Sequence, residues 1–535
     1  SNESLLAAFP SEEELGEAED PWFGPSRVRR FDLVQAEVQT IVNPTYGMDR
    51  DLRDVAFSAR LTLQAYEDSG RVVPLLLAEG RPKTLGRQWE PLTVHEVELD
   101  GEAVPFDRSA DRLFVHLPKV PTPGESFDVV VLYDGSILEP DGQTAIVPLT
   151  GWNWYPRLHP QDRHVFASIV AFPKFWKVAA SGQRIEDLLD GNMRVITSRD
   201  PRPVEQGSVF IVDGRVKESR PPAGSNLPLL RIIRQPNTLA ITARMEDEVY
   251  RHLQQLQTLL GTFPYRELEI VERGVEGGWD GVPGVIVVPQ FDSPPEQVVT
   301  TRVAGNTLLQ ALARQYLAAD MGPASYHDDW LIESLAGWAE CYALHAVGRS
   351  ARCYGAIGQK RLTWRNLLSS NGQSWLIGPV WLAQFSGAAS ANSQLRGPLV
   401  LHRLRLLIGD AACDELLRRT ALSYRGQRLS SRSFMLQAQA VAGLDLRTFF
   451  YGWIFATPQQ PTAQVSYRTE QADDGSWSLH IEGFIDSGRD AAPLPILAPV
   501  FLQMKVDGDE VIQRLLLTED IQETTIEGIP AEPRK

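Results

Sequence analysis

The side chains with the clearest chemical potential lie in two helical segments in the middle of the chain. The first segment, residues 308–316, places Gln310 and Arg314 four residues apart. Residues at i and i+4 lie on the same face of a helix, so an amide and a guanidinium project together. The second segment starts at Trp330 and carries the carboxylate of Glu333. These groups suit hydrogen bonds and an ion pair, because a guanidinium has no lone pair to donate and an amide is a poor metal ligand.

The two segments together resemble the zinc site of the aminopeptidase N family of zinc metallopeptidases. In that family the first helix typically reads HELAHQW, and a glutamate in a WLNEGFA-like segment completes the site. Residues 310–316 and 330–336 of this chain read QALARQY and WLIESLA. The spacing agrees, because Arg314 stands in the place of the second histidine and Glu333 follows it by nineteen residues. A zinc-aminopeptidase fold is what this resemblance implies.

Further segments extend the resemblance over nearly the whole chain after about residue 26. They match, in order, a WFP segment, the approach to a GAMEN loop, that loop, the helix after the catalytic tyrosine and a late helix end. Their residues are 154–156, 263–265, 277–281, 397–404 and 449–454.

Carried over position by position, most of the functional residues are replaced. Gln310 and Arg314 stand where the family has its two zinc-binding histidines. Ala311 replaces the general-base glutamate and cannot accept a proton from water. The catalytic tyrosine falls on Gln394, and only the third ligand position keeps its residue type, as Glu333. One carboxylate cannot replace the three protein ligands of a catalytic zinc, so we expect no catalytic residues, no bound metal and no cofactor.

The replacements suggest a structural role for Arg314. A carboxylate left in an emptied zinc pocket would be a costly unpaired charge. We hypothesise that an Arg314–Glu333 ion pair replaces the zinc as the link between the two helices.

The Gly-rich segment from Gly274 to Gly284 holds two candidate substrate-binding residues. Asp280 occupies the region of the GAMEN glutamate, which anchors the free amine of a substrate, and Trp279 could line a cleft. The alternatives are that Asp280 is a turn residue among glycines and that Trp279 caps a core. For Asp280 we favour the turn.

Three functions remain open. The leading one is a catalytically inactive pseudo-peptidase, a binding or scaffolding protein that keeps a cleft for peptides or a protein partner. The second is a zinc metallo-aminopeptidase with unconventional metal ligands, and the third is an enzyme of another class in the same cleft. Retained zinc and turnover that EDTA abolishes would favour the second.

The pattern of the chain predicts an α+β multidomain protein. The resemblance implies an N-terminal β-saddle domain (26–240), a thermolysin-like, mostly helical domain (241–457) and a small C-terminal β-sandwich (458–535). Residues 1–25 are predicted to be an acidic tether.

Local patterns predict individual elements within these domains. Asp-Gly pairs at 100–101 and 134–135 and the Asp-Gly-Asn at 190–192 predict turns between strands. Helical spacing of apolar residues predicts a helix over 245–260. Apolar or alternating runs predict strands, with residues 94–99, 127–133, 194–197, 268–271, 285–288 and 478–482.

The amino-acid composition excludes some classes of binding partner. The formal net charge is −16, and no Lys/Arg-rich block appears, so nucleic acid and an anionic membrane surface are poor partners. No apolar run approaches the length of about 20 residues that spans a bilayer. The three cysteines, Cys341, Cys353 and Cys413, are odd in number and widely spaced, so we expect buried packing residues rather than a disulfide framework. The non-Met start and the acidic tether favour an extracytoplasmic location.

Overall fold

The structure, a computed structural model, describes most but not all of the sequence. The described residues are 30–42, 54–67, 69–78, 92–136, 139–141, 144–146, 153–159, 162–212, 214–234, 242–273, 280–289, 308–317, 321–324, 328–346, 353, 355, 357–363, 395–450, 453–454, 462–486, 498–506, 509–517 and 521–530. Trp279 and Gln394 lie outside them, as do the side chains of Asp280 and Glu333.

The chain forms two compact units. The N-terminal unit comprises Gly16–Gly322 and Ser423–Arg428. The C-terminal unit comprises Ser1–Leu15, Pro323–Leu422 and Leu429–Lys535. The four domains expected from the sequence stay a prediction.

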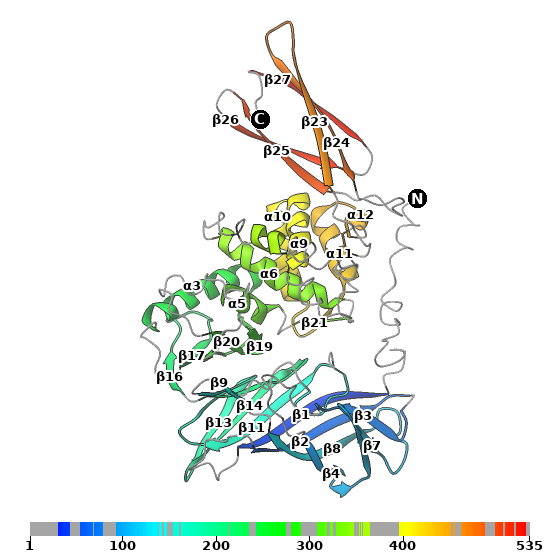
Figure 1. Ribbon diagram of the computed structural model, residues 1–535, viewed down its shortest axis with the longest axis vertical. Helices are drawn as coiled ribbons and strands as arrows, with labels where there is room; N and C mark the ends of the chain where they lie inside the picture. The colour runs from blue at the N-terminus through cyan, green and yellow to red at the C-terminus, as the bar shows by residue number, and fades with distance from the viewer. Residues whose placement is uncertain are drawn as a thin grey trace. The chain divides into compact units, whose positions relative to one another are not determined.

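The largest sheet of the N-terminal unit has eight strands. These are β1 (Phe31–Val42), β2 (Asp54–Ala65), β4 (Thr93–Leu99), β5 (Glu102–Ala103), β8 (Ser126–Ser136), β11 (His164–Pro173), β13 (Gln183–Asp190) and β14 (Met193–Val204). Their order is β13-β14-β11-β1-β2-β8-β4-β5 (Figure 1). β1 therefore lies inside the sheet, parallel to β11 and antiparallel to β2. Its alternating apolar residues put fully buried side chains such as Leu33 and Val38 into the core.

Smaller ladders accompany this sheet. They are β3 (Val72–Leu76), β7 (Arg112–His116) and β6 (Phe106–Ser109) in one sheet, β9 (Glu139–Asp141) with β10 (Thr144–Ile146), and β12 (Lys177–Ala180) with β15 (Val209–Val212).

Two of the three predicted Asp-Gly turns are confirmed. Asp100 and Gly101 have φ values of 50° and 88° between β4 and β5, and Gly191 has φ 58° between β13 and β14. The prediction at 134–135 is wrong, because β8 continues through these residues. Asp134 and Gly135 pair with Ala56 and Val55 of the long strand β2, which holds them extended.

A five-stranded sheet follows in the same unit. Its strands are β16 (Arg215–Ser219), β17 (Leu229–Arg234), β18 (Glu267–Arg273), β20 (Val285–Pro289) and β19 (Asp280–Val282), in that order. β17, β18 and β20 are parallel, and helix α3 (Thr242–Leu260) makes the crossover from β17 to β18. The predicted helix over 245–260 and the two predicted strands are confirmed. Helix α5 (Leu308–Tyr316) also belongs to this unit.

The C-terminal unit is helical around one long, apolar helix. Its described helices are α6 (Asp329–Ala346), α9 (Gly397–Ile408), α10 (Asp410–Ser423), α11 (Ser431–Ala442) and α12 (Arg447–Phe450), which lie together in Figure 1. α9 packs on α6. α11 begins at an N-cap, where the Ser430 hydroxyl accepts a hydrogen bond from the Ser433 amide at 3.0 Å. A short ladder joins β21 (Gly322–Pro323) and β22 (Arg428–Leu429).

The chain returns to strands near its C-terminus. β23 (Thr462–Gln471), β24 (Trp477–Asp486) and β27 (Gln522–Ile529) form one antiparallel sheet, and β25 (Ala498–Val506) pairs with β26 (Asp509–Leu517). The strand predicted at 478–482 is confirmed within β24. The protein is thus a multidomain α/β structure with a large β-rich N-terminal part. None of the described helices combines the length and apolarity needed to cross a membrane.

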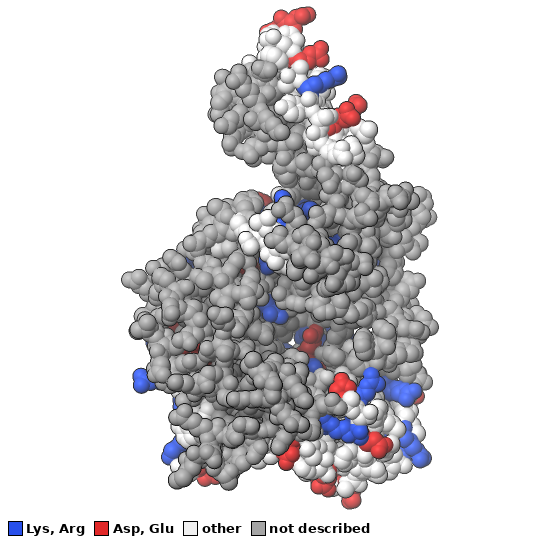
Figure 2. Space-filling view, in the orientation of Figure 1, with Lys and Arg blue, Asp and Glu red and all other residues white. Residues whose placement is uncertain are grey.

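Charged side chains of both signs are mixed on the face shown in Figure 2, where the coloured Lys and Arg residues lie beside Asp and Glu. The described surface on this face therefore offers no broad patch of one sign.

Candidate functional site

Helix α5 carries three of the predicted site residues, as the sequence indicated. Its leucines Leu308, Leu309 and Leu312 are fully buried and hold the helix in the N-terminal unit. Gln310 and Ala311 are each only 2% exposed, and Arg314 is half-buried in the last turn. The side chains of Gln310 and Ala311 are therefore enclosed in the protein.

A neighbouring residue, Gln315, fixes α5 against the edge of the five-stranded sheet. Its side-chain oxygen accepts a hydrogen bond from the Gly284 amide at 2.9 Å. Its side-chain nitrogen donates to the carbonyls of Val282 at 2.9 Å and Val285 at 3.3 Å. Gln315 thus satisfies the backbone of the tight β19–β20 turn, in which Gly284 has φ 76°. The resemblance marked Gln315 as a kept residue type, but the sequence alone gave it no role.

The candidate substrate residue Asp280 belongs to the same hairpin. Asp280 is the first residue of β19, where it pairs with Val287 of β20. The interpretation of Asp280 as a turn residue is therefore wrong, because the three-residue strand starts at it. The short strand β19 as a whole is in contact with α5. A substrate role for Asp280 and Trp279 stays a prediction.

Tyr316 ties the other side of α5 to helix α3. Its hydroxyl donates to the Leu253 carbonyl at 3.3 Å, and its ring meets Phe263 edge-on with centroids 5.2 Å apart. Burial raises the pKa of Tyr316 well above its usual range, so it stays a neutral hydroxyl. Gln315 and Tyr316, the two residues that follow Arg314, are therefore both anchored by hydrogen bonds.

The backbone of Glu333 is fixed within the C-terminal unit. The indole nitrogen of Trp330 donates to the Ser431 hydroxyl at 3.0 Å, and Asp328 accepts from the amide and hydroxyl of Ser431 at 2.6 and 2.7 Å. These bonds join the start of α6 to the start of α11. The hydroxyl of Ser334 donates to the Trp330 carbonyl.

α9 approaches α6 closely at the residue after Glu333. A Cβ atom on Gly397 would lie 1.6 Å from the Ser334 hydroxyl oxygen, so only glycine fits there. The helix that follows the predicted catalytic-tyrosine position therefore packs directly on the helix that carries Glu333.

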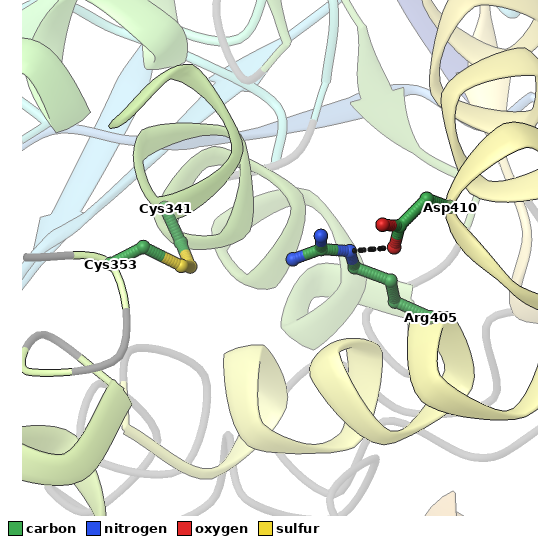
Figure 3. Close-up of a disulfide and its surroundings, with 4 residues drawn as sticks. All are labelled: Cys341, Cys353, Arg405 and Asp410. Carbon is green, nitrogen blue, oxygen red and sulfur yellow. Dashed lines mark hydrogen bonds and ion pairs between the residues drawn. A yellow bond between two sulfur atoms is a disulfide. The ribbon is translucent and has the colours of Figure 1, made fainter. Parts of the chain in front are cut away.

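α6 also carries a disulfide that the sequence did not reveal. Cys341 on α6 is bonded to Cys353, twelve residues later. The expectation of three unpaired packing cysteines is wrong for this pair, because α6 and the chain after it return Cys353 to within bonding distance. Cys413 is unpaired and buried, as expected. Figure 3 shows the guanidinium of Arg405 pointing toward the helix that carries Cys341.

The donor set on α5 does not fit a zinc ion. Gln310 offers an amide, Ala311 no donor and Arg314 a permanent positive charge, whereas protein zinc sites use thiolate, imidazole or carboxylate ligands. Among the described residues, no group of three or more His, Cys, Asp or Glu side chains is placed to hold a metal ion. The side chain of Glu333 and residue Gln394 lie outside the described part of the chain.

Known proteins resemble this chain in structure but not detectably in sequence. No protein-family profile and no curated protein matches the sequence. Solved structures do match. An M1 zinc metallopeptidase from Deinococcus radiodurans, in a single-substitution mutant, aligns with TM-score 0.65 and 19% identity over 83% of this chain and 98% of its own. The unsubstituted enzyme gives TM-score 0.63 and 20% identity over 82% and 97%.

A larger structure agrees with these two. Legionella pneumophila aminopeptidase A, solved with aspartic acid, aligns with TM-score 0.67 and 12% identity over 94% of this chain and 58% of its own. The fold is that of the M1 zinc metallopeptidases. Identities this low show the fold alone, so the chemistry of the M1 enzymes does not transfer with it.

Proposed function

We propose that this chain is a pseudo-peptidase: a protein with the M1 fold that does not cleave peptides by zinc chemistry and acts by binding or scaffolding. The observation that carries this proposal is the face of α5, where Gln310 and Arg314 stand at the i and i+4 positions and Ala311 lies between them. All three substitutions fall on the helix that the resemblance assigns to the metal. The alternative, a zinc aminopeptidase with unconventional ligands, would need donors that this helix does not supply.

The ion pair between Arg314 and Glu333 is part of the same proposal. Arg314 is half-buried on α5, and Glu333 lies on a well-anchored stretch of α6. A guanidinium in the volume of a metal would neutralise the remaining carboxylate without supplying a Lewis acid. The two helices would then be linked by charge rather than by coordination.

We extend the proposal to architecture and location. The M1-like fold and the return to strands after residue 462 support a saddle-shaped N-terminal domain, a thermolysin-like domain and a C-terminal sandwich at the boundaries predicted from the sequence. The Cys341–Cys353 disulfide supports an oxidising, extracytoplasmic compartment, since structural disulfides are rare in the cytosol.

Metal content and hydrolysis test the proposal together. The purified chain is dialysed against zinc without chelator and analysed by mass spectrometry, and the same sample is assayed with aminoacyl-7-amido-4-methylcoumarin substrates. We expect no retained zinc and no release of coumarin beyond the buffer rate. Zinc near one equivalent, or turnover that EDTA abolishes, would establish the zinc-aminopeptidase alternative instead.

A further inference from the structure

A long segment of this acidic chain contains no acidic residue. From Cys341 to Gly409, 69 residues include neither Asp nor Glu, whereas the whole chain has 68 of them in 535 residues. At that average, a segment of this length would hold about nine. The segment does contain eight basic residues, which are Arg349, Arg352, Lys360, Arg361, Arg365, Arg396, Arg403 and Arg405. In a chain of net charge −16, this is a local surplus of positive charge.

Part of that surplus gathers around Trp453 in the C-terminal unit. The guanidinium carbon of Arg403, on α9, lies 4.0 Å from the centroid of the Trp453 ring. Arg396, just before α9, donates to the Trp453 carbonyl at 3.3 Å. Arg361 is near enough for its positive charge to act on Arg403. Two guanidiniums therefore contact one tryptophan, and a third is close to them.

No ion pair with a described carboxylate neutralises Arg361 or Arg403. Asp410, the first acid after the segment, pairs with Arg405 instead, at 2.7 Å (Figure 3). Burial and then the charge of Arg361 lower the pKa of Arg403 to about 10, so it remains protonated at neutral pH. His402 adds no positive charge there, because burial and the neighbouring arginines lower its pKa to about 4.

The cluster is reachable from solvent. Arg361 is exposed and Arg403 is half-buried, whereas Arg396 is buried. The contact with the indole restrains the Arg403 guanidinium, which reduces the entropy lost when it binds a second group. A planar guanidinium fits a carboxylate with two parallel hydrogen bonds.

We propose that Arg361 and Arg403, arranged beside Trp453, bind the carboxylates of an acidic peptide. The proposal rests on the proposed function in one respect, namely that the ligand is a peptide, and it names the class of peptide. Because the whole chain is acidic, the attraction is local and is opposed by a long-range repulsion, which salt screens more strongly than the short-range contact.

The test uses the full chain and a fluorescein-labelled Glu-rich decapeptide, with the same peptide carrying Gln at every Glu as its uncharged counterpart. Fluorescence anisotropy at low salt gives both dissociation constants. We expect the Glu peptide to bind at least tenfold more tightly. Equal binding of the two peptides, or binding of inorganic phosphate without binding of the Glu peptide, overturns the proposal.

Two variants and a control locate the site. Arg403→Gln and Arg361→Gln should each weaken binding of the Glu peptide about tenfold, the range expected for one charge-assisted contact. Arg361 is exposed, so its variant keeps the test valid if Arg403→Gln fails to fold. The matched control is Arg418→Gln on α10, an exposed arginine paired with Glu415. A loss at Arg418→Gln equal to that at Arg361→Gln would show general charge attraction and overturn the site. These readouts are independent of zinc content and coumarin release, so failure here leaves the pseudo-peptidase proposal standing.

Discussion

The side-chain oxygen of Gln315 accepts a hydrogen bond from the backbone amide of Gly284 at 2.9 Å, and its nitrogen reaches back to Val282. One buried amide thus joins a helix to the turn of a neighbouring hairpin. Without it, the buried N–H of Gly284 and the carbonyl of Val282 would lose their partner.

Replacing this amide should therefore destabilise the protein strongly. We expect Gln315→Ala to lower the free energy of unfolding by roughly 2–4 kcal/mol, because unsatisfied buried polar groups cost about 1–3 kcal/mol each and effects on neighbours do not fully add. Urea unfolding followed by circular dichroism measures this. Gln254→Ala, at an exposed position of α3, is the control and should change little. Equal losses in the two variants would contradict the role assigned to Gln315.

Introducing the residue types of the aminopeptidase N zinc motif at three positions of α5 should create a metal site. We expect Gln310→His, Ala311→Glu and Arg314→His together to retain about one zinc per chain after dialysis, since two imidazoles and Glu333 make the three-ligand set of a catalytic zinc. Adding Glu333→Gln to this variant should abolish retention. A folded triple variant that takes up no zinc would show that the positions are assigned wrongly.

A double-mutant cycle tests the proposed ion pair. Arg314→Met and Glu333→Gln, alone and combined, should show a coupling of roughly 0.5–3 kcal/mol in the free energy of unfolding, the range for residues in direct contact. Arg314→Met paired with Glu415→Gln, a residue of α10 that pairs with Arg418 and Arg419, provides the reference cycle. Additive losses at Arg314 and Glu333 would rule out a direct link between them.

The cysteine pairing predicts a simple thiol count. Denatured but unreduced protein should react with one equivalent of a thiol reagent, at Cys413, and reduced protein with three. Native protein should react with none, because Cys413 is buried and burial raises the pKa of its thiol. Three reactive thiols before reduction would exclude the disulfide.

His164 should make stability depend on pH. Burial, followed by the charge of Arg157, lowers its pKa to about 3 in the folded state, and its Nε2 lies 2.8 Å from the Tyr155 hydroxyl. A histidine that is neutral when folded but has an ordinary pKa near 6.5 when unfolded stabilises the protein fully above about pH 6.5. That stability is lost as the pH falls toward 3.

The variant His164→Gln tests whether His164 makes the protein less stable as the pH falls. Urea unfolding between pH 7.5 and 5 should show a decline in the parent protein and a shallower one in the variant. His402, whose pKa is also lowered by burial, contributes in the same direction and remains in both proteins. Identical pH slopes in the two proteins would remove His164 as a cause.

Sequence reasoning succeeded where one local pattern decides the structure. The apolar spacing along α3 and the Asp100-Gly101 turn depend on neighbouring residues alone, and each was predicted. It failed where distant segments decide. Asp134 stays extended because β2 pairs with it, and Cys353 reaches Cys341 only through the path of the chain between them.

The candidate site divides in the same way. Residue types at 310, 311 and 314 are visible in the sequence, and so is their helix. The bonds of Gln315 and the start of β19 at Asp280 arise from packing between separate elements, which spacing does not encode. The segment from Cys341 to Gly409 can be read directly from the sequence. Its positive charge comes from the lack of Asp and Glu, not from closely spaced Lys and Arg residues, so it contains no dense basic block.

The position of β1 inside its sheet governs how the protein can be made. β1 leaves the ribosome well before β11, the strand that completes one of its edges and follows it by more than a hundred residues. Until then the nascent chain carries an apolar strand with an unpaired edge, the kind of surface that promotes aggregation. Such long-range parallel pairing also slows folding. The eight-stranded sheet therefore cannot be completed until β11 has been synthesised. During that interval, protection of β1 by a chaperone would matter more than the final stability of the fold.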